Sequence, residues 1–482
     1  MWAGFDGSAV PGPLLDAIER GRGGGLLLFA YRGNIRSREQ VRGMLREAVA
    51  AAARGGLPPV PVGVDQEGGS VIRIGYGAVF PSAMAIAATG DPANAERAAR
   101  AVALGVLADG IAVNHAPVCD VNVEPRNPVI GTRSFGDEAE AVARYCAAWV
   151  RGSESAGVAT SPKHFPGHGA AAQDSHHTTV DVTAGRALLE RRELVPFRAA
   201  IAAGASSLMT AHVRFPALDE ESIATLSPRI LGDLLRGELR FGGLAITDSL
   251  DMSGLTQVET ADRVTARAVN AGIDAVMVTS GIDKQLDTAE QLALGVPPAR
   301  LGEALARAAA FRDRFGVAVP EEPFNDGPGR ALAAEIAAAS ITHAGPALPG
   351  LGGPVRVAFF APERNSPVEE LAHQDTVLEN ALRERIGSAL AFSMDGTAPE
   401  GDGPLAVCTS SASFDPPQAA RARALLRDGG ILCALRSPYD ATLVPHVPAL
   451  LTYGDVPASL VALADVLAGR TRPGGRLPVR LA

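Results

Sequence analysis

The sequence predicts two domains of the α/β class, a (β/α)8 TIM-like barrel followed by a smaller α/β sandwich domain. The first observation is length, because 482 residues exceed the size of one ordinary domain. The second is an alternation of short apolar runs with alanine- and leucine-rich segments, which implies parallel strands joined by right-handed crossovers. The third is that eight such runs occur before residue 315, and this barrel has eight strands.

The apolar runs of the first region are the expected barrel strands, and the segments between them are the expected helices. In chain order the runs are Met1–Phe5, Leu26–Ala30, Val60–Val64, Ile111–Ala116, Val158–Ser161, Ser207–Thr210, Leu244–Thr247 and Ala275–Thr279. The helical patterns are Gln40–Arg54, Asn94–Leu107, Ala139–Ala156, Arg186–Ala203 and Val264–Ala271. We therefore expect residues 1–315 to form the barrel domain.

A stretch rich in proline, glycine and acidic residues, Val317–Arg330, ends the first region and is interpreted as a linker. A helix over Ala331–Ile341 is expected to lead across, so the linker with its helix spans 316–345. Residues 346–482 are expected to form a mostly parallel sheet with helices. Its expected strands are Val355–Ala361, Ala389–Ser393, Leu405–Ser410, Ile431–Leu435 and Ala449–Tyr453, and its expected helices are Val368–Arg385, Pro417–Arg427 and Ser459–Leu467.

Composition restricts the classes of function. Apolar residues make up 47% and charged residues 20% of the chain, which is typical of a soluble globular protein. The net charge is −9 and no basic run occurs, so a nucleic-acid partner is not expected. No apolar stretch has the length of a membrane span, and the N-terminus lacks a basic start followed by an apolar stretch, so we expect a cytoplasmic protein. Four scattered cysteines are expected to be reduced core thiols.

The segment from Lys163 to His177 carries the densest chemistry of the chain. Four of the nine histidines fall within its last fourteen residues. Pro166 and two glycines disfavour a helix or strand there, which predicts a loop, and loops on a rigid scaffold often carry catalytic side chains. The spacing of Asp174 and His176 lets the carboxylate hydrogen-bond one ring nitrogen and leaves the other free for proton transfer.

Polar residues follow five of the expected strands at the same end of each strand. Barrel enzymes assemble their active sites at the C-terminal ends of the strands, where the loops converge. Helix capping would explain one of these residues but not the set. In chain order they are Asp65, Asp120, Lys163 with His164, His212 and Asp248.

Asp248 has two interpretations. It is either a nucleophile delivered to the barrel mouth by an apolar strand or the N-cap of the next helix, and Asp251 offers an alternative cap. Taken with the histidine-rich loop, the nucleophile is favoured. A structural role is expected for His168 and is possible for His212.

Asp174 and His176, with the other histidines of the same loop, are the alternative candidates for metal ligands. Pro166 and Gly167 separate His164 from His168, so these two rings are not expected to share a helical face. The chain has neither an HExxH motif nor a cysteine-containing metal motif. No metal ligand and no cofactor are therefore expected.

Two arginines near the strand ends each have two interpretations. Arg73 follows Asp65 closely, and the two could hold sugar hydroxyls, or could form an ion pair that braces the loop. Arg133 lies at the tip of a tight loop, where it either binds substrate or neutralises Asp120.

Five motifs occur in order along the chain: DQEGG, NPVIGTRSFG, KHFPGHG followed by DSH, LMTAHV and ITDSLDM. Together they closely resemble family 3 glycoside hydrolases of the β-N-acetylglucosaminidase (β-N-acetylhexosaminidase) type, which are enzymes of peptidoglycan recycling. The match spans most of the first region. The segment Gly474–Val479 resembles the α/β second domain of two-domain members.

The resemblance implies a retaining exo-β-N-acetylglucosaminidase that hydrolyses terminal β-linked N-acetylglucosamine from muropeptide or chito-oligosaccharide fragments. Asp248 aligns with the nucleophile that forms a covalent glycosyl-enzyme. His176 aligns with the general acid/base, which Asp174 orients, although retaining glycosidases usually pair two carboxylates. The residues that align with those gripping the sugar are Asp65, Arg73, Arg133, Lys163 and His164. The implied partner is a small carbohydrate.

Three alternatives remain open. Dyad-bearing relatives that transfer the sugar to phosphate make a β-N-acetylglucosaminide phosphorylase the main alternative. Relatives that act on β-glucosides take a glutamate acid/base from the second domain, which a chain carrying the Asp174–His176 dyad does not need. A sugar-binding protein without activity is the distant alternative, against which the intact Asp248 and dyad argue.

Overall fold

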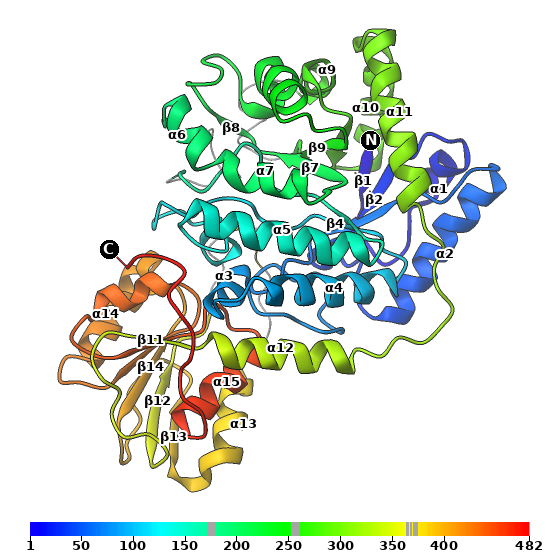
Figure 1. The fold of residues 1–482 in the computed structure, drawn as a ribbon. Coiled ribbons are helices and arrows are strands. Elements are labelled where there is room, and N and C mark those ends of the chain that lie inside the picture. The colour runs from blue at the N-terminus through cyan, green and yellow to red at the C-terminus, as the bar shows by residue number, and fades with distance from the viewer. Residues whose placement is uncertain (172–179, 252–260, 363–365, 367–368, 370–374, 482) are drawn as a thin grey trace.

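The structure, a computed structural model, describes all residues except 172–179, 252–260, 363–365, 367–368, 370–374 and 482. Its larger domain is a ring of eight parallel strands in chain order, with helices around it (Figure 1). Between the fifth and sixth of these strands, backbone hydrogen bonds just beyond the fifth continue the ring: Phe165 N donates to Met209 O at 2.9 Å. The strands are β1 (Trp2–Gly4), β2 (Gly25–Leu27), β3 (Val62–Val64), β4 (Val113–Asn114), β5 (Ala159–Thr160), β7 (Ser207–Thr210), β9 (Leu244–Ser249) and β10 (Ala275–Val278). The expected TIM-like barrel is thus confirmed.

The helices of this domain lie outside the strands (Figure 1). The expected helix over 186–203 is divided in two, because Pro196 lacks the N–H that would bond the carbonyl of Arg192 and its ring crowds that carbonyl. The helices are α1 (Gly12–Glu19), α2 (Arg38–Arg54), α3 (Ala83–Ala88), α4 (Ala93–Leu107), α5 (Ala139–Ser155), α6 (Arg186–Arg191), α7 (Leu194–Ala202), the π-helix η4 (Arg229–Glu238), α9 (Ala261–Ala271), α10 (Ile282–Gly295) and α11 (Pro298–Phe315). A short parallel pair, β6 (Val180–Asp181) and β8 (Val213–Arg214), lies apart from the ring.

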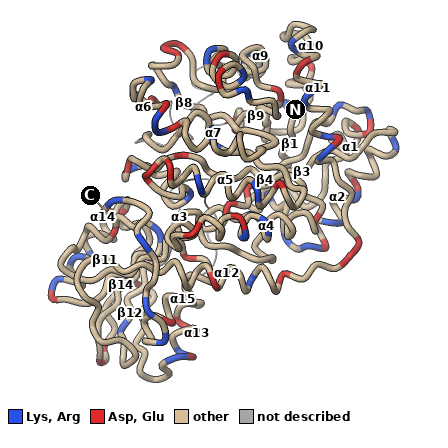
Figure 2. Tube along the Cα trace, in the orientation of Figure 1, with Lys and Arg blue, Asp and Glu red and all other residues tan. Residues whose placement is uncertain are grey.

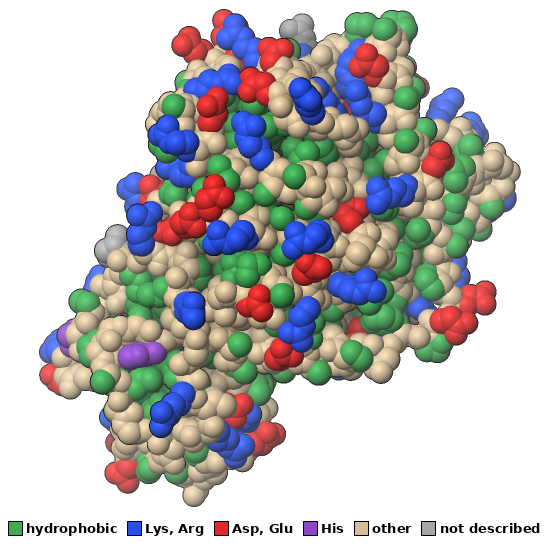
Figure 3. Space-filling view, in the orientation of Figure 1, with side chains coloured by type: hydrophobic (Ala, Val, Ile, Leu, Met, Phe, Trp, Pro, Cys, Tyr) green, Lys and Arg blue, Asp and Glu red, His purple; other side chains and the backbone are tan. Residues whose placement is uncertain are grey.

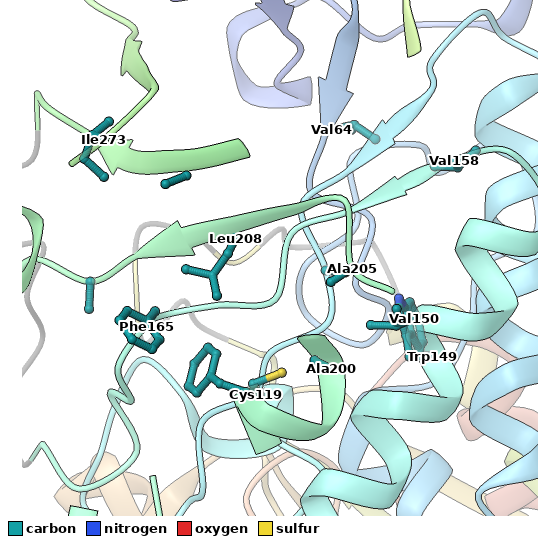
Figure 4. Packing of buried hydrophobic residues seen from close by; sticks show 14 of the residues in the cluster. Val64, Cys119, Trp149, Val150, Val158, Phe165, Ala200, Ala205, Leu208 and Ile273 are labelled. Atoms are coloured by element: carbon teal, nitrogen blue, oxygen red, sulfur yellow. The ribbon is translucent and has the colours of Figure 1, made fainter. Parts of the chain in front are cut away.

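Two apolar layers stabilise the barrel. Alternate strand residues such as Trp2 and Met277 form one buried cluster, which Phe311 and Phe315 of α11 join. The opposite faces of the strands pack against the helices, as Figure 4 shows for Leu208, which points from β7 toward α7. This two-sided burial explains why the strands are continuous apolar runs in the sequence.

The second domain is a six-stranded sheet between helices. Its order is β11-β16-β15-β14-β12-β13, and only β11 (Thr342–Ala344) runs antiparallel to its neighbour. That strand lies within the segment expected to be a linker. The other strands are β12 (Val355–Phe359), β13 (Leu390–Ser393), β14 (Leu405–Thr409), β15 (Ile431–Ala434) and β16 (Ala449–Leu451), and the helices are α12 (Gly327–Ser340), α13 (Asp375–Ile386), α14 (Pro416–Leu425) and α15 (Pro457–Leu467). The expected α/β sandwich is confirmed.

The two domains share an apolar interface. Met84, Ala85 and Ala88 of α3 are buried in the same cluster as residues of the second domain, including Tyr453. The interface also carries polar contacts, since the Ser82 hydroxyl donates to the Tyr453 carbonyl at 2.6 Å. Because α3 directly follows the loop after β3, this interface lies close to one of the loops that carry predicted site residues.

Charged side chains of both signs are interspersed along both domains (Figures 2 and 3). No helix among the described residues has the length and apolar character needed to cross a membrane. The four cysteines, Cys119, Cys146, Cys408 and Cys433, are buried and carry free thiols, as expected.

Candidate active site

A pocket of about 270 Å³ lies at the C-terminal ends of the barrel strands. Its volume is near the lower limit for small-molecule sites, roughly 300 Å³. Six of the eight predicted site residues line it: Asp65, Arg73, Arg133, Lys163, His164 and Asp248. The other two, Asp174 and His176, lie outside the described residues.

Asp248 is the next-to-last residue of β9, so its side chain is positioned by the barrel itself. Its Oδ1 accepts a hydrogen bond from the Ser249 backbone N–H at 2.7 Å. The Ser249 carbonyl in turn lies 3.0 Å from Nε2 of the buried His212, whose Nδ1 lies 2.8 Å from the Thr225 hydroxyl. His212 therefore joins the ends of two neighbouring strands, which supports the structural role considered for it.

Asp251 has a separate role from Asp248. Its Oδ2 accepts hydrogen bonds from the backbone N–H groups of Thr279 at 2.6 Å and Ser280 at 2.8 Å, and its Oδ1 pairs with Lys284 at 2.9 Å. The carboxylate thus ties the segment after β9 to the end of β10. Asp248 itself remains directed at the pocket, which is the position a nucleophile requires.

Buried charges on three loops meet at one side of the pocket. Lys163 Nζ pairs with Asp65 Oδ1 at 2.6 Å and with Glu67 Oε1 at 2.7 Å. Arg133 makes a two-pronged contact with Glu67, from Nε to Oε2 and from Nη2 to Oε1, each at 2.9 Å. The side chains of Lys163, Glu67 and Arg133 are each at most 6% exposed. Two cations and two anions balance there, which offsets the cost of burying each charge.

The same pairing shifts the pKa values of these groups. Burial alone would raise the pKa of Asp65, but the Lys163 ammonium and the Arg73 guanidinium hold it well below its usual range. Burial would also raise the pKa of Glu67, but Arg133 and Lys163 lower it to about 2. Burial would lower the pKa of Lys163, but Asp65 and Glu67 raise it above its ordinary value. All of these groups are therefore charged at neutral pH.

Asp120 orients His164 instead of pairing with Arg133. Its Oδ2 lies 2.7 Å from His164 Nδ1, and its carboxylate also accepts the backbone N–H of His168 at 2.6 Å. Burial would raise the pKa of Asp120, but His164 and His168 lower it, so the carboxylate is ionised. His164 Nε2 faces the pocket, 3.5 Å from Arg133 Nη2, and it is an acceptor in the neutral tautomer that donates Nδ1–H to Asp120. Arg133 forms its ion pair with Glu67, so the pair with Asp120 that the sequence offered as one interpretation is not formed.

Gln66 holds Arg73 in place. The buried Gln66 Oε1 accepts the backbone N–H groups of Arg73 and Ile74, each at 2.9 Å, and its Nε2 donates to the Ile74 carbonyl. These bonds turn the segment after β3 back toward the barrel mouth. The carboxylate of Asp65 contacts Lys163, while Arg73 lies close enough to lower the pKa of Asp65.

Sequence reasoning missed Glu67 as a site residue. The signal was present, because Asp65 and Glu67 are two residues apart in an extended segment and so project to the same side. It also missed Tyr31, which lines the pocket from the turn after β2. His168, expected to be structural, is buried and gives its carbonyl to Asn127 Nδ2 at 3.0 Å. Within the part of the chain that the structure describes, no three His, Cys, Asp or Glu side chains form a group that could hold a metal ion.

Residues 15–309 match the family model described as the glycosyl hydrolase family 3 N terminal domain. The chain belongs to glycoside hydrolase family 3. The resemblance expected from the five motifs is thus confirmed, and it makes the chain a glycoside hydrolase by family.

Individual relatives of the family 3 chain extend this comparison. It is 33% identical over 372 residues to β-hexosaminidase A of Pseudoalteromonas piscicida, an alignment that covers 70% of this chain and 62% of that protein. It is 40% identical over 289 residues to a β-hexosaminidase of Stenotrophomonas maltophilia, an alignment that covers 57% of this chain and 82% of that protein. A family 3 β-N-acetylglucosaminidase from Paenibacillus sp. str. FPU-7 superposes with a TM-score of 0.93 at 32% identity, covering 100% of this chain and 97% of that one.

The second domain of this family 3 chain contacts the loop that carries Asp120 and Arg133. The Tyr439 hydroxyl accepts a hydrogen bond from Asn122 Nδ2 at 3.1 Å, and the Asn122 backbone N–H donates to the Gly136 carbonyl at 2.8 Å. Asn122 therefore joins the two ends of the loop, and Tyr439 joins this loop to the second domain.

We expect Tyr439→Phe to raise KM several-fold and to lower the free energy of unfolding by about 1 kcal/mol, because the buried Asn122 amide loses its partner. Tyr145→Phe is a matched control. It removes the hydroxyl that donates to the Ala87 carbonyl of α3 at 3.1 Å, and it retains the ring that stacks on Phe135 of this loop. It should lower stability similarly and leave KM unchanged. Urea unfolding and steady-state kinetics test both variants. Equal KM values for Tyr439→Phe and Tyr145→Phe would contradict a role for the Tyr439–Asn122 contact in the site.

Proposed function

We propose that this family 3 enzyme is a retaining exo-β-N-acetylglucosaminidase that releases terminal β-linked N-acetylglucosamine from muropeptide or chito-oligosaccharide fragments. The observation that carries the proposal is the pocket itself, whose lining includes both Asp248 and a buried group of hydrogen-bonding charges. The names of the relatives support the same substrate class.

The buried charges suit recognition of a sugar ring. Asp65 and Glu67 keep acceptor oxygens at the pocket, Lys163 and Arg133 supply donors, and His164 Nε2 supplies a further acceptor. Because these groups already hold one another, little of their conformational freedom is lost when hydroxyl groups bind. We infer that they hold the hydroxyls of the terminal sugar and leave its anomeric carbon toward Asp248.

The chemistry follows from this placement. The ionised Asp248 carboxylate attacks the anomeric carbon and forms a glycosyl-enzyme ester, while His176 donates a proton to the departing oxygen. In the second half-reaction His176 takes a proton from water, whose oxygen attacks the anomeric carbon and releases Asp248. Asp174 keeps the imidazole in the tautomer that these two transfers need.

We place the enzyme in the cytoplasm, in peptidoglycan recycling. The four buried free thiols support a reducing compartment, where disulfides seldom form. A pocket of about 270 Å³ suits a single terminal sugar, which is the part of a muropeptide that an exo-acting enzyme would bind.

The deciding experiment measures chromophore release from aryl β-N-acetylglucosaminide and aryl β-glucoside, each with and without phosphate, and identifies the sugar product. We expect free N-acetylglucosamine and a strong preference for the acetamido sugar. A sugar 1-phosphate formed only with phosphate would replace the hydrolase with a phosphorylase. Preference for the glucoside would reject N-acetylglucosaminides as the substrate class. No turnover of either glycoside would favour a sugar-binding protein.

His176→Ala should slow substrates with poor leaving groups more than substrates with activated leaving groups, because only the former need a proton in the transition state. We expect a loss of about a hundredfold on N,N′-diacetylchitobiose and a much smaller loss of glycosylation rate on a dinitrophenyl glycoside. Pre-steady-state kinetics separate the two half-reactions. Equal losses on both substrates would contradict the acid role.

A further inference from the structure

We propose that Tyr31 is the surface on which the leaving-group sugar stacks, a role that rests on the proposed function. Tyr31 lines the same pocket as Asp248 and Lys163, but its side chain is aromatic and lies nearer the solvent. The residue is 52% exposed, whereas Lys163 is 2% exposed. An aromatic ring at the open side of a sugar pocket offers an apolar face to the C–H groups of a pyranose.

The ring is supported from beneath. The Arg73 guanidinium carbon lies 5.8 Å from the Tyr31 ring centroid, and the Phe29 ring centroid lies 5.2 Å away at a tilt of 42°. The Arg32 guanidinium carbon lies 5.9 Å from the same ring. Tyr31 thus packs on three neighbours, and about half of the residue remains exposed to solvent.

The turn that carries Tyr31 is also held firmly. It is a 3-10 turn over Ala30–Arg32 directly after β2, and the buried Asn34 side chain closes it. Asn34 Oδ1 accepts the Phe29 N–H at 3.0 Å, and Asn34 Nδ2 donates to the carbonyls of Phe5 and Gly7 at 3.0 and 2.8 Å. A ring fixed in this way loses little freedom when a sugar stacks on it.

The exposed position indicates which sugar the ring meets. In an exo-acting pocket the buried groups hold the terminal sugar, and the bond to be cleaved faces the opening so that the leaving group can depart. The group bonded to the anomeric carbon therefore lies at the rim, where Tyr31 is. We infer that Tyr31 contributes to the choice of leaving group and not to recognition of the terminal ring.

The experiment compares N,N′-diacetylchitobiose with β-N-acetylglucosaminyl fluoride, whose leaving group is too small to reach the ring. Tyr31→Ala should lower kcat/KM about tenfold on chitobiose and leave the fluoride within about twofold. Tyr31→Phe should keep both values, because the ring face is retained. Leu294→Ala is the control, since Leu294 is 83% exposed on α10 and does not line the pocket.

An equal loss on both substrates would overturn the proposal, because Tyr31 would then act on the terminal sugar or on the fold. No loss on either would overturn it as well. If the unaltered enzyme cleaves neither N-acetylglucosaminide, the proposed function fails separately. The kcat/KM values of Tyr31→Ala and the unaltered enzyme are then compared on cellobiose and β-glucosyl fluoride. A selective loss on cellobiose would still support the stacking role.

Discussion

Asp248→Ala is expected to lower kcat on aryl β-N-acetylglucosaminide at least about a thousandfold while leaving the fold intact. In the proposed mechanism this carboxylate forms the bond to the anomeric carbon, and alanine supplies no nucleophile in its place. Asp248 is only partly buried at the end of β9, so its removal leaves no large buried cavity. The measurement is steady-state turnover, with circular dichroism and urea unfolding to verify folding.

Two further experiments test whether Asp248 is the nucleophile. Added azide should restore turnover of the activated substrate by Asp248→Ala and yield an α-glycosyl azide, because a small anion can occupy the space of the carboxylate. Asp251→Asn is the matched control, since Asp251 also lines the pocket but ties the segment after β9 to β10. It should keep activity within about tenfold. Equal losses in both variants would reject Asp248 as the nucleophile.

Lys163→Met is expected to lower the free energy of unfolding by about 3–5 kcal/mol at pH 7, because Asp65 and Glu67 lose the cation they share in a buried site. Activity should fall as well, since the groups proposed to bind the sugar hydroxyls lose their arrangement. Lys284→Met is the matched control, because it removes the other lysine of the chain and a Lys–Asp pair that is partly exposed. That change should cost less than about 1 kcal/mol.

The Lys163→Met loss should also depend on pH. In the unaltered protein the pKa of Glu67 falls from its ordinary 4.5 to about 2, so its stabilisation is present above pH 4.5 and disappears as the pH falls toward 2. Without Lys163, Asp65 and Glu67 each lose one of the cations that lower their pKa values, so both pKa values rise, while Arg73 and Arg133 remain. The stability difference between the two proteins should therefore be largest near neutrality and shrink in acid. A difference that is independent of pH would show that Lys163 stabilises the fold through packing alone.

Local pattern was sufficient for much of the fold. Short apolar runs bounded by polar residues predicted the barrel strands to within a few residues, and Ser207–Thr210 is the observed β7 itself. The named helical patterns did not include α1, α3, η4, α10 or α11, and they joined α6 and α7 into one helix across Pro196. Alanine-rich segments carry little contrast between faces, so their limits depend on which side the rest of the molecule covers.

The candidate site was predicted in outline for a topological reason. Parallel strands in a barrel bring their C-terminal ends to one rim, so Asp65, Lys163 and Asp248 could be grouped before their positions were known. The roles of Asp174 and His176 remain predictions, since both lie outside the described residues. The partner of Arg133 could not be predicted, because Glu67 is 66 residues away in the sequence.

The sequence by itself determined the family, the order of strands and helices, and the end of the barrel at which the chemistry lies. Those properties follow from motifs and from periodicity, which are local. Only the tertiary structure decided that Glu67 balances Lys163 and Arg133, and that Asp120 orients His164. It also decided that Tyr439 of the second domain supports the loop that carries Asp120 and Arg133. These pairings depend on distances between segments far apart in the chain, and burial is what makes each pairing strong enough to matter.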